Sequence, residues 1–250
     1  MVEALCPRRW AVELLPQLAG VLDEVARLVS PSDGFDPSRL RQSFVIRSGE
    51  AVLAILGSRL TELSLAEAPA AKLRFELEGP DDVEDLRAGK VALGIGGYGD
   101  LTSDIDVLSL AEEELVGVLR ADHRLATARV TPRRFADLQH IVVSRRAVER
   151  GPIDEALGAL GLRRPIAAIV PSALAAITMV LSSDATAVLP SRLVARLVDA
   201  TGLHVYPVPV DTQPVQILAV WHHRFTRAPG HRWLRSCVTR AVADHRPVGG

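Results

Sequence analysis

The sequence has few aromatic residues and few cysteines, and each shortage excludes a class of protein. Aromatic residues make up 4% of the 250, which argues against stacking surfaces for single-stranded nucleic acid. The two cysteines, Cys6 and Cys237, are isolated and lack metal-site spacing, which favours a reduced cytoplasmic protein over one stabilised by disulfides. A formal net charge of -1 gives no global field that would attract nucleic acid or cationic partners.

Long hydrophobic runs and common catalytic motifs are also missing. No apolar run reaches about 18 residues, so we expect no membrane span, and charged residues interrupt the N-terminus where a signal peptide needs an apolar core. The sequence contains no nucleophile elbow, P-loop, H-E-x-x-H or paired-cysteine motif. The adjacent pair His222-His223 would point to opposite faces of a strand. We therefore expect no metal site and no cofactor.

Strands and helices alternate in the part of the chain between residues 44 and 97. Apolar and β-branched runs of strand length flank segments with helical spacing of apolar residues. Such alternation implies a parallel sheet, whose ligands bind beyond the carboxyl ends of the strands. Here those ends are Ser48–Glu50, Gly79–Asp81 and Gly96–Tyr98.

The glycine-rich segment 94–99 matches the spacing G-x-G-x-x-G. A dinucleotide site needs that turn to open a helix after the first strand. Here it follows the third strand and continues into the polar sequence DLTSD. We interpret these glycines as the end of a strand, not as a nucleotide site.

The alternation continues along the rest of the chain. Two strands are predicted within residues 105–119, and the acidic segment Glu112–Glu114 is interpreted as a solvated turn. Helices are predicted at 132–138, 152–160, 173–181, 192–200 and 229–243, with strands between them. The most economical layout is two similar α/β lobes joined by two crossings, near 110–115 and 208–215, with a cleft between the lobes.

The predicted domain boundaries follow from this layout. Residues 1–34 contain an amphipathic helix at 9–29, which either docks on the core or serves as a linker and dimerisation helix. The domain proper is residues 35–250. Lobe I takes residues 35–110 together with 213–250, and lobe II takes 111–212.

Seven stretches, taken in order, resemble the C-terminal part of LysR-type transcriptional regulators. They are PRRWAVELLPQLAGVLDEV, FDPSRLRQSFVIRSGE, LRADHRLA, PRRFADLQHIVVS, GPIDEALGALGLRRPIAAIVPSALAA, SSDATAVLPSRLVARL and HRWLR. The resemblance implies a type 2 periplasmic-binding-protein fold, in which two Rossmann-like lobes hold a small-molecule effector. It also implies a homodimer, and tetramers in full-length proteins. No winged helix-turn-helix sequence precedes the expected linker helix, so DNA would be contacted only through a domain outside this sequence.

The resemblance further implies a set of ligand contacts at strand ends and helix starts. These residues are Ser48, Gly49, Glu50, Gly79, Gly97, Tyr98, Ser144, Pro171, Ser172, Trp221 and His222. In lobe I they follow the first three strands, in lobe II they follow the strand at 140–144 and precede the helix at 173, and Trp221 and His222 lie beside the mouth. Glu50 departs from a simple carboxylate cradle and leaves room for a neutral, amine-bearing or monoacid effector.

We therefore predict a non-enzymatic, effector-sensing domain that binds a small aromatic or carboxylic acid and has no membrane partner. One alternative is a small-molecule-binding or enzymatic protein on the same two-lobe fold. Ser48, Glu50 and His222 are the only candidate catalytic groups in that case. The other alternative is a dimerisation module with a vestigial cleft.

Overall fold

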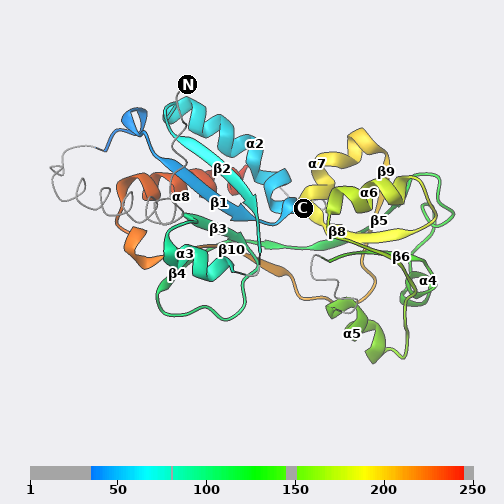
Figure 1. Cartoon of the computed structure of the whole chain (residues 1–250). Helices are drawn as coiled ribbons and strands as arrows, with labels where there is room; N and C mark the ends of the chain where they lie inside the picture. The colour runs from blue at the N-terminus through cyan, green and yellow to red at the C-terminus, as the bar shows by residue number, and fades with distance from the viewer. Residues whose placement is uncertain (1–34, 80, 145–150, 245–250) are drawn as a thin grey trace, which may run out of the picture. The chain divides into compact units, whose positions relative to one another are not determined.

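A computed structural model describes residues 35–79, 81–144 and 151–244 (Figure 1). The strands are β1 (Ser43–Ser48), β2 (Lys72–Leu77), β3 (Leu93–Gly96), β4 (Ile105–Glu113), β5 (Leu115–Arg120), β6 (His140–Val143), β7 (Ile166–Val170), β8 (Thr186–Pro190), β9 (Leu203–Pro207) and β10 (Val215–His222). The helices are η1 (Pro37–Arg39), α2 (Glu50–Glu67), α3 (Asp82–Ala88), α4 (Pro132–Ala136), α5 (Pro152–Ala159), α6 (Ala173–Leu181), α7 (Ser191–Thr201), η2 (His223–Phe225) and α8 (Pro229–Ala243). The predicted helix at 9–29 lies outside the described residues.

Contacts within the chain divide it into two compact units. Among the described residues, unit 1 consists of the chain up to Gly49, Arg59–Ser109 and Leu218–Arg240. Unit 2 consists of Glu50–Ser58, Leu110–Ile217 and the chain from Ala241 onward. Helices α2 and α8 and strands β4 and β10 therefore each contribute residues to both units. In the described ranges, no helix has the length and apolar character needed to cross a membrane.

Unit 1 is built on a mixed sheet with the strand order β2-β1-β3-β10-β4. Strand β1 pairs in parallel with β2 and with β3, whereas β10 runs antiparallel to β3. The predicted parallel arrangement of the segment 44–97 is thus confirmed. A loop, and no helix, follows β3, which agrees with our interpretation that the glycines at 94–99 are not a nucleotide site.

Helices cover both faces of this sheet because the residues of β1 alternate. Phe44 is fully buried on one face, where its ring lies 6.1 Å from that of Trp233 on α8. The indole of Trp233 donates to Glu67 at the end of α2, over 3.0 Å, so α2 and α8 share this face. On the other face Val45 packs against a cluster that includes Leu86 of α3.

Unit 2 repeats the plan with the strand order β7-β6-β8-β5-β9. Strands β6, β7 and β8 are parallel neighbours, while β5 runs antiparallel to both β8 and β9. Helices α6 and α7 pack on β5 and β8. Phe135 of α4 and Leu157 of α5 pack in one cluster with Tyr206 of β9. Two mixed sheets with flanking helices confirm the predicted α/β class.

Helix ends in unit 2 also follow their sequence signals. The Ser172 hydroxyl accepts from the Ala175 amide over 3.0 Å, so it is the N-cap of α6 as predicted. Gly202 ends α7 with φ +66°, a left-handed conformation that a residue without Cβ adopts at little cost. Local sequence signals therefore specify where α6 begins and where α7 ends.

The interpretation of Glu112–Glu114 as a solvated turn is wrong. Strand β4 runs unbroken through Glu113, and only Glu114 separates it from β5. Glu113 is only 4% exposed and accepts from the Ser191 hydroxyl at the start of α7, over 2.9 Å. Its hydrogen-bond donors lie 78 residues along the chain, so no local pattern could reveal them.

Candidate functional site

The carboxyl ends of β1, β2 and β3 lie next to one another in unit 1. Ser48 pairs with Leu77 of β2 and with Ile95 of β3, so the residues that follow these strands share one edge of the sheet. Five of the predicted contact residues lie at this edge: Ser48, Gly49, Gly79, Gly97 and Tyr98. Ser48 is 2% exposed, and its carbonyl accepts from the Glu78 amide over 3.1 Å.

The loop at Gly79 is fixed by charged groups. The Gly79 amide donates to the Asp82 carboxylate over 2.9 Å, which sets the start of α3. The same carboxylate accepts from the Arg47 guanidinium, which also binds Glu76 and Asp85. Burial lowers the pKa of Arg47, but the hydrogen bonds from its three carboxylate partners outweigh it, so the pKa lies above its usual value. Arg47 therefore stays a permanent cation at this edge.

Tyr98 turns back into unit 1 from the loop after β3. Its ring packs with the cluster of Leu86 and Val220, and a Cβ at Gly94 would overlap the Tyr98 hydroxyl. That hydroxyl is buried and has no hydrogen-bond partner among the described residues. Burial, reinforced by the nearby Asp82 carboxylate, raises the pKa of Tyr98 well above its usual value. The ring thus supports the sheet edge as a neutral core side chain.

A second group of predicted residues lies at the matching edge of unit 2. The Ser144 amide donates to the carbonyl of Val170 over 2.9 Å, which brings the ends of the parallel strands β6 and β7 together. Pro171 and Ser172 follow β7 directly and lead into α6. Ser144, Pro171 and Ser172 are therefore neighbours, although 27 or more residues separate Ser144 from the other two.

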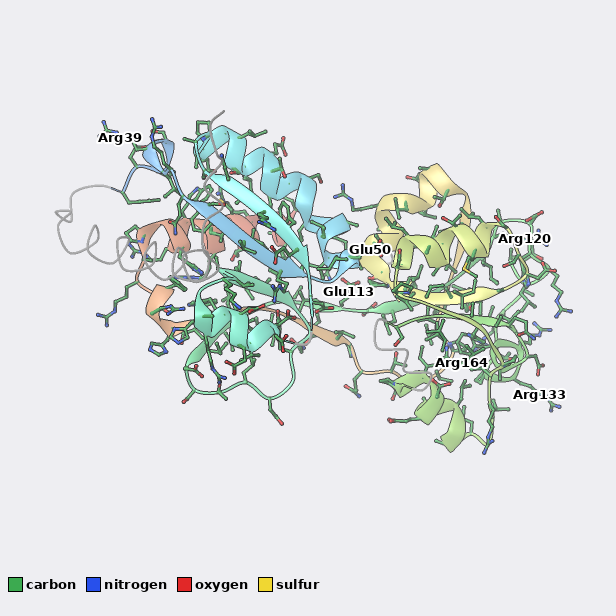
Figure 2. All side chains as sticks on the ribbon, in the orientation of Figure 1. Arg39, Glu50, Glu113, Arg120, Arg133 and Arg164 are labelled. Carbon is green, nitrogen blue, oxygen red and sulfur yellow. The ribbon has the colours of Figure 1, made fainter. Side chains whose placement is uncertain are left out.

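Glu50 joins this group, because the first turns of α2 belong to unit 2. One carboxylate oxygen of Glu50 (labelled in Figure 2) accepts from the Ser172 hydroxyl over 2.9 Å. The other accepts from the Ala173 amide over 2.8 Å. The unpaired amides at a helix start favour anions, so Glu50 occupies the position at α6 that a bound carboxylate would take.

Trp221 and His222 do not lie beside the carboxyl ends, contrary to the sequence-based expectation. Val220 pairs with Gly94, and β10 runs antiparallel to β3, so the two residues lie toward the amino end of β3. The Trp221 indole donates to the Thr226 hydroxyl over 2.8 Å, and the His222 ring accepts from the Arg224 amide over 3.3 Å. Both side chains organise the turn that precedes α8. The sequence predicts the strand but does not give its direction.

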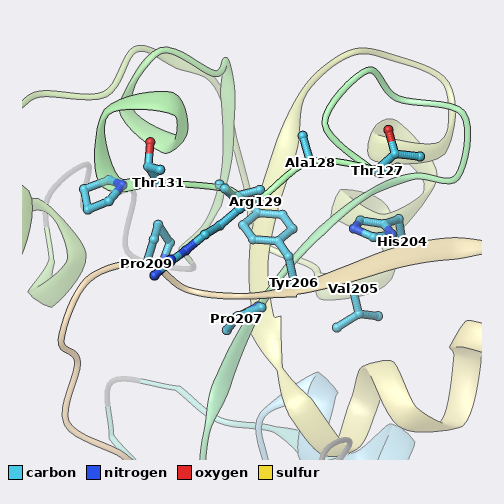
Figure 3. A pocket seen from close by; sticks show the side chains of 12 residues that line it. Thr127, Ala128, Arg129, Thr131, His204, Val205, Tyr206, Pro207 and Pro209 are labelled. Carbon is cyan, nitrogen blue, oxygen red and sulfur yellow. The ribbon is translucent and has the colours of Figure 1, made fainter.

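A cavity of about 470 Å³ in unit 2 had no counterpart in the sequence-based expectations (Figure 3). Two segments line it: 126–132, between β5 and α4, and 204–209, in and after β9. Arg129, His204 and Tyr206 are its titratable side chains. No motif indicates it because neither segment carries a motif, and only the pairing of β9 with β5 brings them together. Within the described ranges, no group of three or more His, Cys, Asp or Glu residues could hold a metal ion.

Comparison with known proteins agrees with this architecture. The model of the LysR substrate binding domain matches residues 41–243. The HTH-type transcriptional regulator LinR of Sphingobium indicum is 27% identical over 240 residues, covering 90% of this chain and 77% of LinR. The HTH-type transcriptional activator NagR of a Ralstonia species is 25% identical over 239 residues, covering 95% of this chain and 79% of NagR.

A solved structure gives the same result. The crystal structure of the probable transcriptional regulator PA0477 from Pseudomonas aeruginosa superposes with a TM-score of 0.77 at 25% identity. The superposition covers 96% of this chain and 80% of that protein. The family model spans both sheets described above, and both relatives are named as HTH-type transcriptional regulators or activators. The chain therefore belongs to the LysR substrate-binding domain family.

Proposed function

We propose that this chain is the effector-binding domain of a LysR-type transcriptional regulator. The observation that carries the proposal is the family match over 41–243, which includes every residue of the two strand-end groups. A small molecule would bind better to one conformation of the domain than to another and shift the population toward it. In a homodimer, that shift would change the geometry presented to DNA-binding heads. The domain would need no catalytic chemistry of its own.

The unit 2 group supports a specific binding site for the effector. Ser144, Pro171 and Ser172 lie at the ends of parallel strands, where ligands of α/β sheets bind. Glu50 already satisfies the Ser172 hydroxyl and the Ala173 amide. An effector that used these donors through its own carboxylate would have to displace Glu50. We therefore narrow the effector to a small molecule, aromatic or aliphatic, that presents a hydrogen-bond donor or an ammonium group to Glu50.

The edge of unit 1 is the second part of the proposal. Ser48 is buried, and Gly79 and Gly97 lie near it at the strand ends, where the Gly79 amide already donates to Asp82. Glycine allows a ligand to approach the backbone closely because no Cβ intervenes. These residues would contribute backbone hydrogen bonds, so we expect Ser48→Ala to weaken effector binding less than a change at Glu50.

A thermal-shift screen tests the proposed function. Purified protein would be heated with matched acids, amides and amines that share one carbon skeleton, beginning with benzoate, benzamide and benzylamine. A ligand at about 100 times its Kd adds roughly 2.7 kcal/mol to the stability of the folded state. For a domain of this size, that raises the Tm by about 2–4 °C for each kcal/mol.

Variants then locate the site. Ser172→Trp fills the unit 2 group and should abolish the shift, while Glu50→Gln should weaken binding of amines about tenfold. Glu62→Gln on the same helix, an exposed carboxylate paired with Arg59, is the matched control and should bind as the wild type does. Saturable binding of the amine or the amide that survives Ser172→Trp would contradict the proposed site. No shift from a broad panel would contradict effector sensing altogether.

A further inference from the structure

The 470 Å³ cavity of unit 2 has the size and the walls of a small-molecule site. Ligand pockets commonly measure about 300–1,000 Å³ and combine apolar walls with a few polar groups. Here the apolar wall consists of alanine, valine and proline side chains together with the Tyr206 ring. None of these residues belongs to the strand-end groups described above. The cavity is therefore a separate candidate site.

The charge of the cavity wall has one sign. Arg129, an exposed residue, is its one permanently charged side chain, His204 and Tyr206 are its other titratable ones, and no acidic residue lines it. The Arg129 guanidinium makes no ion pair within the part of the chain that the structure describes, although its carbonyl accepts from Arg134 over 2.9 Å. Figure 3 shows the Arg129 side chain extended toward Pro209. An uncompensated guanidinium against an apolar wall is suited to a carboxylate on an apolar body.

The same wall excludes a peptide strand as the occupant. Strand β9 pairs with β5 and is the outermost strand of its sheet, so its outer edge could in principle accept another strand. Pro207 and Pro209 lack the amide hydrogens that a strand ladder needs, and proline at an edge prevents such pairing. A single cation also fits a monoanion better than a multiply charged phosphate or nucleic acid backbone.

We propose that this cavity is a second binding site, which takes a small monocarboxylic acid whose carboxylate pairs with Arg129 and whose apolar body lies against Tyr206 and Pro207. The site complements the Glu50 group, which disfavours carboxylates. Thr127 and His204 supply further hydrogen-bonding groups at its margin. Both the cation and the apolar wall belong to unit 2, so the site is complete within one unit.

The test uses 4-fluorobenzoate as the probe, with 4-fluorobenzamide as its neutral counterpart. Binding would be followed by fluorine NMR, and its location by the imidazole proton resonances of His204. We expect saturable 4-fluorobenzoate binding that shifts the His204 resonances in the wild type and equally in Ser172→Trp. Arg129→Gln should weaken binding about fivefold or more, because a charge-assisted hydrogen bond is lost. Arg133→Gln, an exposed arginine outside the cavity, should change it little.

Four results would overturn the second site. The His204 resonances could stay unmoved, Arg129→Gln could bind 4-fluorobenzoate as tightly as Arg133→Gln does, or the neutral amide could bind Ser172→Trp as tightly as the acid does. Loss of all 4-fluorobenzoate binding in Ser172→Trp would also overturn it, while leaving the proposed effector function standing. Conversely, binding that needs Arg129 but not Ser172 supports the second site even if no effector is found for the Glu50 group.

Discussion

The guanidinium of Arg192 lies 2.9 Å from the carboxylate of Glu113, and the two side chains are 15% and 6% exposed. The same carboxylate accepts from the Arg192 amide over 3.1 Å and from the Ser191 hydroxyl over 2.9 Å. Glu113, the last residue of β4, thus fixes the first turn of α7 through these hydrogen bonds. The Ser191 hydroxyl is buried and donates to Glu113, whereas the Arg192 guanidinium also donates to the Glu112 carbonyl over 2.6 Å.

We expect Glu113→Ala to lower the free energy of unfolding by about 2 kcal/mol, since the buried Ser191 hydroxyl loses its acceptor and the Arg192 guanidinium loses its ion pair. Urea denaturation measures this loss. Glu112→Ala, the exposed neighbour, should change stability by about 0.5 kcal/mol or less. Equal effects of the two substitutions would show that the pair with Arg192 contributes little.

The two tyrosines should respond in opposite directions when the hydroxyl is removed. The Tyr98 hydroxyl is buried without a partner among the described residues, so Tyr98→Phe removes an unsatisfied polar group and should stabilise the fold by about 1 kcal/mol. The Tyr206 hydroxyl bonds to Thr186, so Tyr206→Phe should destabilise by about 1 kcal/mol. The Tm values of the two variants, compared with that of the wild type, test both expectations. Destabilisation by Tyr98→Phe would indicate a hydrogen bond to water.

Arg47 should contribute far more to stability than its neighbour Arg74. The Arg47 side chain is 14% exposed and lies between three carboxylates that repel one another without it. We expect Arg47→Ala to cost about 3 kcal/mol. Arg74 is 72% exposed and pairs with Glu76, so Arg74→Ala should cost less than about 1 kcal/mol. Urea denaturation at low and high salt would check both values, and the small cost of Arg74→Ala should decrease at high salt because an exposed ion pair is screened.

Two buried histidines should make the protein less stable in acid. Burial lowers the pKa of His140 and that of His231 to about 4. The unfolded chain takes up these protons near pH 6.5, so it binds more protons than the folded state does between about pH 6.5 and 4. The free energy of unfolding is therefore highest above this range. It falls as the pH drops through the range, by about 2 kcal/mol for each histidine between pH 7 and 5.

A single variant tests this pH dependence. The His140 ring bonds to the Phe135 carbonyl over 2.8 Å, and His140→Gln keeps a donor there without a titrating group. Its free energy of unfolding should fall by about 2 kcal/mol less than that of the wild type between pH 7 and 5. An unchanged pH slope would mean that His140 already takes up its proton in the folded protein.

The sequence predicts the parts of this fold that depend on local pattern. The strand-helix alternation, the Ser172 cap and the closing helix at 229–243 all follow from spacing and capping residues. The direction of β10 could not be predicted, because an apolar strand has the same pattern in either direction. Trp221 and His222 lie toward the amino end of β3 because β10 runs antiparallel to it.

The candidate sites were predictable only in part, for the same reason. The strand-end residues of each unit could be grouped in advance, because parallel strands end at one edge. The partners of Glu113 and the walls of the 470 Å³ cavity are brought together by long-range pairing of segments far apart in the chain. The spacing of apolar residues along the chain does not reveal such long-range pairing. The ligand-contact roles of the strand-end residues remain predictions.

The position of the unit 2 strands in the chain, between β4 and β10 of the unit 1 sheet, has a consequence for synthesis on the ribosome. Chains grow from the N-terminus at about 5–20 residues per second. The sheet of unit 1 needs β10, which ends at His222, whereas all five strands of the unit 2 sheet precede residue 208. Unit 2 can therefore complete its sheet while the edge of β3 still awaits its antiparallel neighbour. Vectorial folding would begin with the half of the protein that is encoded in the middle of the gene.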